Sequence, residues 1–326
     1  MHDIALIGAG RIGKIHAANI AADPRLRLAY VVDPTSAAAD LAGRYGSQVV
    51  DFAAVLADPS VRGVVVASST DTHLDYSLAA AKAGKAVFCE KPLDQDLERA
   101  RTAAREFDAL DARLLLAFNR RFDGNFAALK VRLASGEVGQ LETLHIISHD
   151  PAPPPAEYVA TSGGIYRDMV IHDFDMARWL LGEEVVEVFS TKSVLVDPAI
   201  GAAGDADTAK TILRTAKGRL CVISSSRRSG YGYDQRIEAF CSAGMIRAQN
   251  QHETTLEVWN EAGASSDRFQ NFFIDRYAGA YAAEMAHFVD VLEGAKPLID
   301  HHDGVAALAL AEAAQRSSDE GLPVRL

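Results

Sequence analysis

Short apolar runs alternate with helical patterns in the first third of the chain. The runs have the length and aliphatic character of buried strands, and they are Ile4–Ile7, Leu28–Val32, Val61–Ala67, Ala86–Cys89 and Leu114–Phe118. Between them, apolar residues recur at helical spacing in 37–45, 74–83 and 97–107. Because strands alternate with helices, we predict a parallel sheet with right-handed crossovers.

The pattern changes after about Arg121. Longer strand-like segments follow, several separated by tight turns such as 216–218 and 242–244; they are Thr143–His149, Val185–Val196, Ala209–Thr215, Leu220–Ser226, Arg236–Cys241 and Thr255–Trp259. Closely spaced strands of this kind predict a large, mainly antiparallel sheet. Helical patterns at about 166–181, 280–292 and 304–317 make this part an α+β region.

The first predicted strand leads into Gly8-Ala9-Gly10-Arg11-Ile12-Gly13, and the second predicted strand ends in Asp33, twenty residues after Gly13. Strand, glycine-rich turn, helix and acid together form the dinucleotide-binding fingerprint of a Rossmann fold. Gly8 permits the tight turn, Gly10 lets the backbone approach a pyrophosphate, and Gly13 lets the helix pack on the strand. We expect cofactor contacts from Gly8, Gly10, Arg11, Ile12, Gly13 and Asp33.

Asp33 also indicates which dinucleotide is used. Its carboxylate accepts hydrogen bonds from ribose hydroxyls and repels a 2′-phosphate, and the following Pro34-Thr35-Ser36 offers no cation. We therefore predict NAD rather than NADP as cofactor, with Arg11 or Arg44 as the residues that would allow NADP.

Length and composition fit a two-domain enzyme. A chain of 326 residues exceeds the usual size of one core, so we predict a doubly wound α/β Rossmann domain at 1–121 and an α+β domain at 122–326. The net charge of −11 argues against nucleic acid or an anionic membrane as partner. No apolar run reaches eighteen residues and no signal peptide is evident; the three cysteines lie far apart in apolar segments, so we predict a cytoplasmic protein with reduced thiols.

The first candidate for chemistry is Glu90-Lys91-Pro92, which follows a predicted strand at its carboxyl end, where ligands of such folds bind. Lys91 could donate to a substrate hydroxyl and stabilise a developing alkoxide. The alternative is a polar cap on the strand. The sequence allows either a cis or a trans peptide bond before Pro92.

The second candidate is a polar stripe on the helix predicted from about Tyr166. Asp168, His172 and Asp175 follow at i, i+4 and i+7, and an imidazole one turn from a carboxylate is a general base with an orienting partner. The alternatives are a helix cap with an ordinary surface pair, or a carboxylate–imidazole metal site that includes His149. We predict no metal, because no cysteine lies near and a histidine base suffices for alcohol oxidation.

Two further segments carry polar side chains. Asn119-Arg120-Arg121-Phe122-Asp123 follows the last Rossmann strand, and one arginine could bind substrate hydroxyls while the other pairs with an acid. The alternative for this segment is a charged hinge between domains. The pair His301-His302 fits a solvated loop better than a ligand set.

These motifs together resemble the Gfo/Idh/MocA oxidoreductase family over nearly the whole chain, and most closely its branch that oxidises inositols. The resemblance rests on the glycine-rich turn with His16, on 90–92, on 167–178, on 231–238 and on Arg276-Tyr277. The turn 242–245 departs from the usual family pattern, without consequence for the chemistry.

The resemblance implies the roles of the site residues. Lys91, Asp168 and His172 would form a catalytic triad, with substrate contacts from Lys91, Arg121, Asp150, Asp168, His172 and Tyr233. Further cofactor contacts would come from Ser68, Ser69, Thr70, His73, Glu90 and Lys91.

The resemblance also implies NAD-dependent oxidation of a cyclic polyol, such as myo-inositol to its 2-ketone, by a homotetramer that packs through its large sheet. A related sugar or another inositol isomer is the alternative substrate. A non-catalytic NAD-sensing protein is the more distant alternative.

Overall fold

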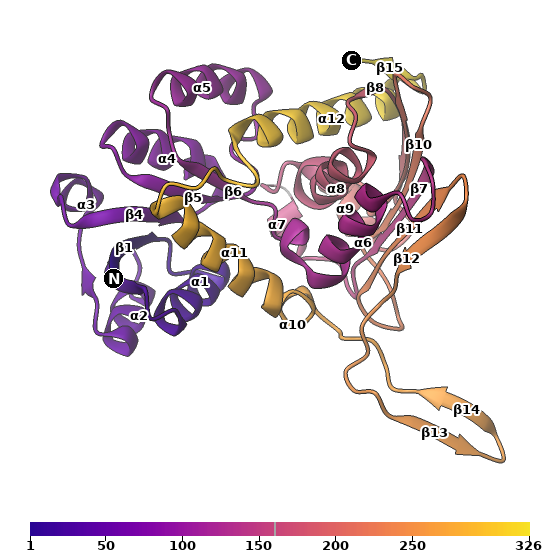
Figure 1. Ribbon diagram of the computed structural model, residues 1–326, viewed down its shortest axis with the longest axis horizontal. Coiled ribbons are helices and arrows are strands. Elements are labelled where there is room, and N and C mark those ends of the chain that lie inside the picture. The colour runs from indigo at the N-terminus through magenta and orange to yellow at the C-terminus, as the bar shows by residue number, and fades with distance from the viewer. Residues whose placement is uncertain (160) are drawn as a thin grey trace. The chain divides into compact units, whose positions relative to one another are not determined.

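The computed structural model describes residues 1–159 and 161–326, and the chain forms two compact units (Figure 1). Unit 1 comprises 1–119 and 280–308, and unit 2 comprises 120–279 and 309–326. The segment 280–308 packs with unit 1, although it lies in the predicted second domain.

Unit 1 is built on a six-stranded parallel sheet with the strand order β3-β2-β1-β4-β5-β6. Its strands are β1 (His2–Ile7), β2 (Leu26–Val32), β3 (Gln48–Val49), β4 (Val61–Val66), β5 (Ala86–Glu90) and β6 (Leu114–Ala117). The order reverses at β1, which lies between β2 and β4, so the point where ligands bind in such sheets is at the carboxyl end of β1. The parallel α/β prediction is confirmed.

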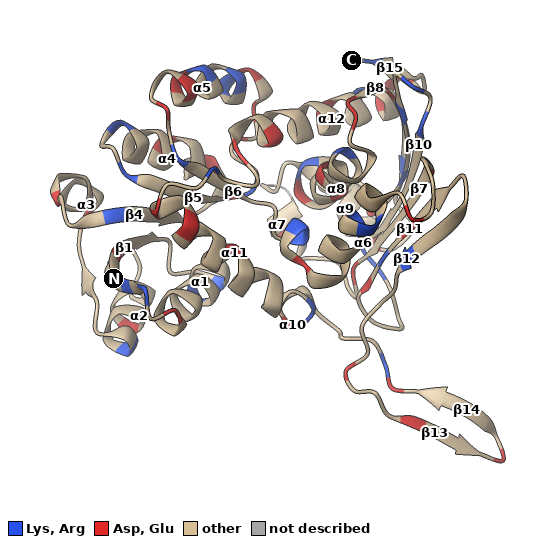
Figure 2. Cartoon of the chain, in the orientation of Figure 1, with Lys and Arg blue, Asp and Glu red and all other residues tan. Residues whose placement is uncertain are grey.

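Unit 1 has helices between its strands and one helix, α11 (Ala278–Leu292), from later in the chain. They are α1 (Arg11–Ala22), α2 (Ala37–Tyr45), α3 (Phe52–Ala57), α4 (His73–Lys82), α5 (Leu97–Ala109) and α11. Asp51 and Asp96 cap α3 and α5 by accepting main-chain N–H groups, and α2 ends at Gly46 in the left-handed region. Acidic and basic residues are interspersed along α5 (Figure 2). The central strands are buried on both faces, which explains their nearly continuous aliphatic sequences.

Unit 2 is built on a seven-stranded sheet with the order β12-β11-β7-β10-β9-β8-β15. Its strands are β7 (Leu141–His149), β8 (Val185–Ser193), β9 (Thr208–Thr215), β10 (Leu220–Ser226), β11 (Asp234–Cys241), β12 (Gly244–Ala248) and β15 (Val324–Arg325). Only β7 and β10 pair in parallel among these strands, so the predicted mainly antiparallel sheet is confirmed.

Helical segments cover one face of this sheet (Figure 1). They are α6 (Gly124–Ser135), α7 (Ala156–Val159), α8 (Ile171–Leu181) and α9 (Pro198–Ala202), with the short α10 (Phe273–Arg276) farther along the chain. The predicted helix over 166–181 is in fact two elements, a π-helical turn η3 (Tyr166–Val170) followed by α8. The long helix α12 (His301–Glu320) contributes its first turns to unit 1 and the rest to unit 2. None of the helices in the described ranges is long and apolar enough to cross a bilayer.

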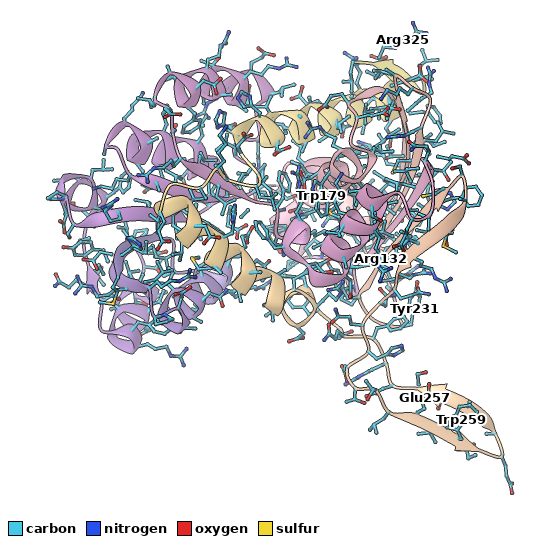
Figure 3. All side chains as sticks on the ribbon, viewed as in Figure 1. Arg132, Trp179, Tyr231, Glu257, Trp259 and Arg325 are labelled. Carbon is cyan, nitrogen blue, oxygen red and sulfur yellow. The ribbon has the colours of Figure 1, made fainter. Side chains whose placement is uncertain are left out.

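The segment predicted as a strand over 255–259 does not join the large sheet. It forms a separate hairpin of β13 (Glu257–Asn260) and β14 (Gly263–Ser266), which extends away from the rest of unit 2 (Figure 1). Every residue of these two strands is exposed, and Trp259 is 76 % exposed near the tip, beside Glu257 (Figure 3). The alternating sequence predicted a strand correctly, but it could not show which strand would be its partner.

Candidate functional site

The glycine-rich turn between β1 and α1 has the geometry of a phosphate-binding loop. Gly8 has φ +97°, and a Cβ on it would lie 2.3 Å from the Ala67 carbonyl oxygen. A Cβ on Gly13 would lie 2.0 Å from the Gly8 carbonyl oxygen, so only glycine lets α1 begin this close to β1. A Cβ on Gly10 would meet no heavy atom of the described residues within 4 Å. The turn therefore leaves room for a pyrophosphate at the N-terminus of α1.

Asp33 follows β2 and joins two loops through its carboxylate. Oδ2 accepts a hydrogen bond from Ala9 N at 2.8 Å, and Oδ1 accepts from Thr35 N and Oγ1 at 2.8 and 2.5 Å. Burial would raise the pKa of Asp33, but these hydrogen bonds outweigh it and hold the pKa below its ordinary value. The negative charge beside the turn suits ribose hydroxyls and disfavours a 2′-phosphate.

The loop after β4 and the turn after β5 are linked by His73. Its Nδ1 lies 2.8 Å from Pro92 O and its Nε2 lies 3.2 Å from Ser68 O, and the ring is buried. These internal contacts favour a structural part for His73, whereas Ser68, Ser69 and Thr70 keep exposed surface for a cofactor.

Lys91 follows β5 and is half-buried, and the Lys91–Pro92 peptide bond is cis. The carboxyl ends of parallel strands meet at one edge of a sheet. The predicted cofactor residues of unit 1 therefore share one edge.

Buried polar side chains from α1 and α11 lie near Glu90. His16 is fully buried, with its Nε2 2.7 Å from Glu90 Oε1. Glu284 on α11 is also fully buried, and neither of its carboxyl oxygens has a hydrogen-bond partner among the described residues. Burial, aided by the charge of Glu90, raises the pKa of Glu284 well above its ordinary value, which favours the protonated acid.

In unit 2, Asp168 lies in the π-helical turn η3 and has two kinds of partner. The Tyr158 hydroxyl donates to Oδ1 at 2.8 Å, and the Arg227 guanidinium donates to Oδ2 from Nη2 and Nη1 at 3.3 and 3.4 Å. His172 follows four positions later, at the start of α8. Four residues are close to one turn of either helix type, so Asp168 and His172 lie on the same side of this segment.

The third member of the predicted stripe has a different environment. Asp175 is fully buried, and Arg121 donates to it from Nε and Nη2 at 2.9 and 2.5 Å. The neighbouring Arg120 pairs in the same way with buried Asp173, at 2.5 Å. These two buried ion pairs favour a supporting role for Arg121 over the predicted substrate contact.

Asp150 and Tyr233 lie at the ends of adjacent strands of the large sheet. Asp150 follows β7, and burial raises its pKa to about 7 although the nearby Arg227 and Arg120 act to lower it. Tyr233 precedes β11 and is almost fully buried, with its ring edge-on to Tyr277 at a centroid distance of 6.0 Å. Asp150 is thus a carboxyl whose charge changes near neutral pH, close to Asp168.

The histidine pair at 301 and 302 is not a solvated loop pair, so that prediction is wrong. Both residues begin α12, and each Nε2 lies 2.9 Å from Asp108 Oδ1 at the end of α5. The hydrogen bond from His301 holds the pKa of Asp108 below its ordinary value.

This cluster does not favour a metal. A cation on both Nε2 atoms would place the His301 proton on Nδ1, which is buried without an acceptor in the described part of the chain. His149, the other metal candidate of the sequence, has its Nε2 2.9 Å from Ser224 Oγ, and the strand alternation places it on the opposite face of β7 from Ser148.

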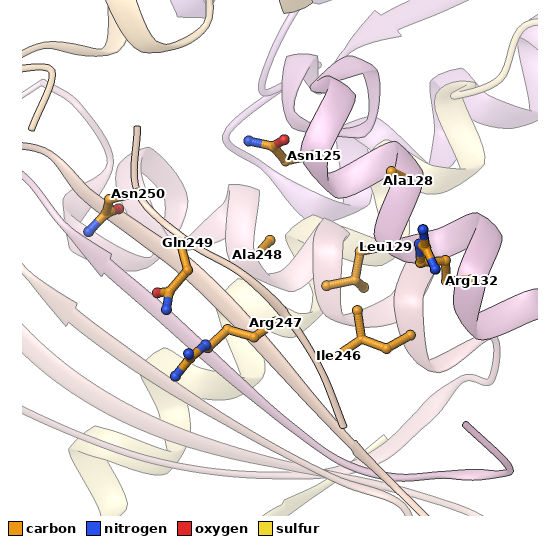
Figure 4. A pocket seen from close by; sticks show the side chains of 9 residues that line it. All are labelled: Asn125, Ala128, Leu129, Arg132, Ile246, Arg247, Ala248, Gln249 and Asn250. Atoms are coloured by element: carbon orange, nitrogen blue, oxygen red, sulfur yellow. The ribbon is translucent and has the colours of Figure 1, made fainter. Parts of the chain in front are cut away.

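A shallow hollow lies between α6 and β12 in unit 2 (Figure 4). It is lined by Asn125, Ala128, Leu129, Arg132, Ile246, Arg247, Ala248, Gln249 and Asn250. Arg132 pairs with Glu137 at 2.8 Å, and Asn250 Nδ2 donates to Asp234 at 2.7 Å. Its lining among the described residues includes none of the predicted site residues, so we do not assign it to the chemistry.

Three residues of the site region were missed in the sequence. Arg227, Tyr158 and Asp205 come from separate segments and contact Asp168 or the main chain beside it. The only signal was the Arg227-Arg228 pair directly after an apolar strand, where a buried charge is unusual.

Known proteins match the chain over both units. A family profile described as an oxidoreductase family with an NAD-binding Rossmann fold matches residues 2–118, and the GFO/IDH/MocA C-terminal domain matches residues 126–247. An inositol 2-dehydrogenase of Rhizobium meliloti is 47% identical over 317 residues, which is 97% of this chain and 96% of the relative.

Solved structures have the same fold. A myo-inositol dehydrogenase from Corynebacterium glutamicum is 43% identical with a TM-score of 0.96, and the match covers 100% of this chain and 99% of that one. A scyllo-inositol dehydrogenase from Lactobacillus casei, solved with bound cofactor NAD(H) and scyllo-inositol, is 28% identical with a TM-score of 0.93 over 100% and 99% of the two chains. The sequence, the open glycine turn and these matches agree that this chain belongs to the Gfo/Idh/MocA oxidoreductase family and has an NAD-binding Rossmann domain.

Proposed function

We propose that this protein oxidises one ring hydroxyl of a cyclic polyol with NAD⁺, and that the substrate is myo-inositol and the product 2-keto-myo-inositol. The observation that carries the proposal is the Asp168–His172 pair, in which a carboxylate with fixed partners lies one helical turn from an imidazole. Relatives whose names state inositol oxidation support the choice of substrate.

His172 acts as the general base in this proposal. Its imidazole takes the proton of the substrate hydroxyl, and Asp168 orients the ring and stabilises the imidazolium that forms. Lys91 donates a hydrogen bond to the reacting oxygen and stabilises its developing negative charge. Bound NAD⁺ supplies the acceptor for the hydride that leaves the carbinol carbon, so the products are a ketone, NADH and one proton.

Residues 1–121 hold the cofactor in our proposal. The rest of the chain to residue 326, apart from 280–308, which pack with unit 1, binds the substrate and other subunits. Gly8, Gly10, Gly13 and the N-terminus of α1 fit the pyrophosphate, because only the absence of side chains keeps that space open. Asp33 selects NAD, and Ser68, Ser69, Thr70 and Glu90 line the same edge. Asp150 and Tyr233 complete the substrate contacts.

We propose a homotetramer that packs through the uncovered face of the large sheet. Strand pairing places the exposed side chains of Phe189, Ile212 and Val222 side by side on that face, and Phe240 beside Met245. A row of exposed apolar side chains across neighbouring strands is typical of an interface. Light scattering of the protein with Ile212→Lys and Val222→Lys tests this assembly, since two buried charges would dissociate it.

We propose the cytoplasm as location. Cys89, Cys221 and Cys241 are free and buried, and burial raises the pKa of the Cys89 thiol to about 12. Buried, protonated thiols suit a reducing compartment and take no part in the chemistry.

The test is NADH formation with myo-inositol, scyllo-inositol and an aldose, each offered with NAD⁺ and with NADP⁺. We expect the highest kcat/KM with myo-inositol and NAD⁺, and loss of turnover in His172→Ala. A higher value with scyllo-inositol would favour the alternative substrate, to which the NAD(H)-bound Lactobacillus casei structure points. Tight NAD binding without turnover on any polyol would refute the enzyme proposal and favour the NAD-sensing alternative.

A further inference from the structure

Arg227 is an arginine enclosed by acids in unit 2. Its side chain is 2 % exposed, although arginine is among the residues that are least often buried. It follows β10, and its main-chain N–H donates to Asp207 O at 2.8 Å. Asp207 in turn accepts the main-chain N–H groups of Leu195, Val196 and Asp197, so the backbone of Arg227 is anchored to a well-connected loop.

The guanidinium of Arg227 contacts two aspartates that belong to different segments. Nη2 lies 3.3 Å from Asp168 Oδ2 and 3.7 Å from Asp205 Oδ2. Asp205 also accepts the main-chain N–H of Ile165 through Oδ1 at 3.0 Å, directly before η3. Both ends of the segment from Ile165 to Asp168 are therefore held by one buried acid–base cluster.

Asp168 has neighbours of both charges and a neutral one. Arg227 provides a positive charge that contacts Asp168, while Asp205 and Asp150 add negative charges nearby and Tyr158 adds a neutral hydroxyl on Oδ1. His172, the proposed base, lies four residues along the same helical segment. A change at Arg227 or Asp205 thus alters the field at the acid–base couple without removing either member.

We infer that Arg227 is a positioning residue for the reaction, which fixes the orientation of Asp168 and balances its charge while Asp205 moderates that effect. The inference rests on the proposed function of Asp168 and His172. At 2 % exposure Arg227 is too enclosed to bind a polyol, so it acts through the carboxyls beside it, on Asp168 by direct contact and on Asp150 through its charge. Removing a cation beside the couple favours its protonated form, and removing an anion favours its deprotonated form.

The test compares Arg227→Met, Arg227→Lys and Asp205→Asn by the pH dependence of kcat/KM for the holoenzyme. We expect Arg227→Met to lose about 10- to 100-fold in kcat/KM at neutral pH, the range typical of outer partners of a functional site. Its acid limb should move to higher pH, Arg227→Lys should recover part of both effects, and Asp205→Asn should move the acid limb to lower pH. The exposed neighbour supplies the control, since Arg228→Met should leave the profile unchanged.

The opposite shifts of Arg227→Met and Asp205→Asn support the inference. An equal loss at all pH values with no shift in either variant would overturn it, because a purely structural arginine changes the amount of folded enzyme and not the titration. If Arg227→Met does not fold, Asp205→Asn alone tests the inference: a shift of its acid limb to lower pH supports it, and no shift or a shift to higher pH overturns it. NMR titration of the His172 ring in the apo proteins compares the same variants without any turnover. If the wild type shows no activity, the proposed function is refuted, but the effect of Arg227 on the titration can still be measured in this way.

Discussion

The two halves of the candidate site are built by different means. In unit 1 the cofactor cradle is made of backbone, and its essential feature is the absence of side chains at Gly8, Gly10 and Gly13. In unit 2 the proposed acid–base couple depends on side chains from several segments, and Arg227 and Tyr158 both contact Asp168. A binding loop made of backbone comes from one short stretch of sequence, whereas a cluster of side chains from distant segments forms only when the chain folds. The first is therefore visible in a sequence and the second is largely hidden.

The largest expected effect is that of His172→Ala, which should lower turnover while leaving NAD binding unchanged. Replacing His172 with Ala removes the proposed general base and should lower kcat by about two to four orders of magnitude. NAD binding, followed by fluorescence titration, should stay within about twofold, because His172 belongs to unit 2. Near-normal NADH production by this variant would show that another residue is the base.

The converse change affects the cradle alone. In Gly10→Ala the added Cβ meets no heavy atom of the described residues within 4 Å but enters the open space at the N-terminus of α1, so NAD binding should weaken by about 10- to 100-fold, or about 1.4 to 2.7 kcal/mol. The melting temperature of the apo protein should hardly change. Gly43→Ala, in α2 and also free of contacts within 4 Å among the described residues, is the matched control and should bind NAD normally. Equal binding by both variants would exclude the proposed phosphate position.

Asp150 in unit 2 should affect the pH dependence of kcat/KM. Burial raises its pKa to about 7, so the carboxylate that would accept substrate hydroxyls forms only as the pH rises through neutrality. Since His172 must also lose its proton, kcat/KM of the wild type should fall with a slope approaching two on the acid side. In Asp150→Asn we expect a slope of one and a kcat/KM about tenfold lower at pH 8. An unchanged slope would place Asp150 outside the substrate site.

The smallest expected effect concerns stability in unit 1. Glu284 has a pKa raised by burial, so the unfolded chain ionises first and stability falls as the pH rises above about 4.5 toward the folded pKa. Glu284→Gln has no such titration and should gain stability relative to the wild type between pH 5 and pH 8 in urea denaturation. A constant difference across that range would mean that Glu284 is already ionised in the folded protein.

The sequence predicted the fold class well because its signals are local. The parallel strands of unit 1 are apolar runs, and the helices between them have helical spacing, so each could be found without knowing its neighbours. The two-residue β3 and the pairing of β13 with β14 were missed, since neither is specified by a local pattern. The domain boundary was predicted incompletely for the same reason, because nothing in the sequence of 280–308 indicates that this segment packs with unit 1.

The candidate site could be predicted from the sequence only in part. Asp168 and His172 are candidates in the sequence because they are four residues apart on one helical segment, and Gly8, Gly10 and Gly13 because they fall within six residues. Asp175, three residues after His172, belongs to the same predicted stripe but is paired with Arg121, which comes from another part of the chain and could not be matched to it in advance. Arg227 and Asp205 were missed for the same reason, since each reaches the site from a distant strand end or loop.

The hairpin of β13 and β14 makes this protein convenient for optical work. The chain has two tryptophans; Trp259 stands in water on the hairpin, while Trp179 is half-buried beneath the cations of Arg121 and Lys130. In a Trp179→Phe protein all indole emission would come from the hairpin, with a red-shifted maximum and easy quenching by iodide. Any event that covers the hairpin, such as crystal growth or antibody capture, would then shift the emission to the blue.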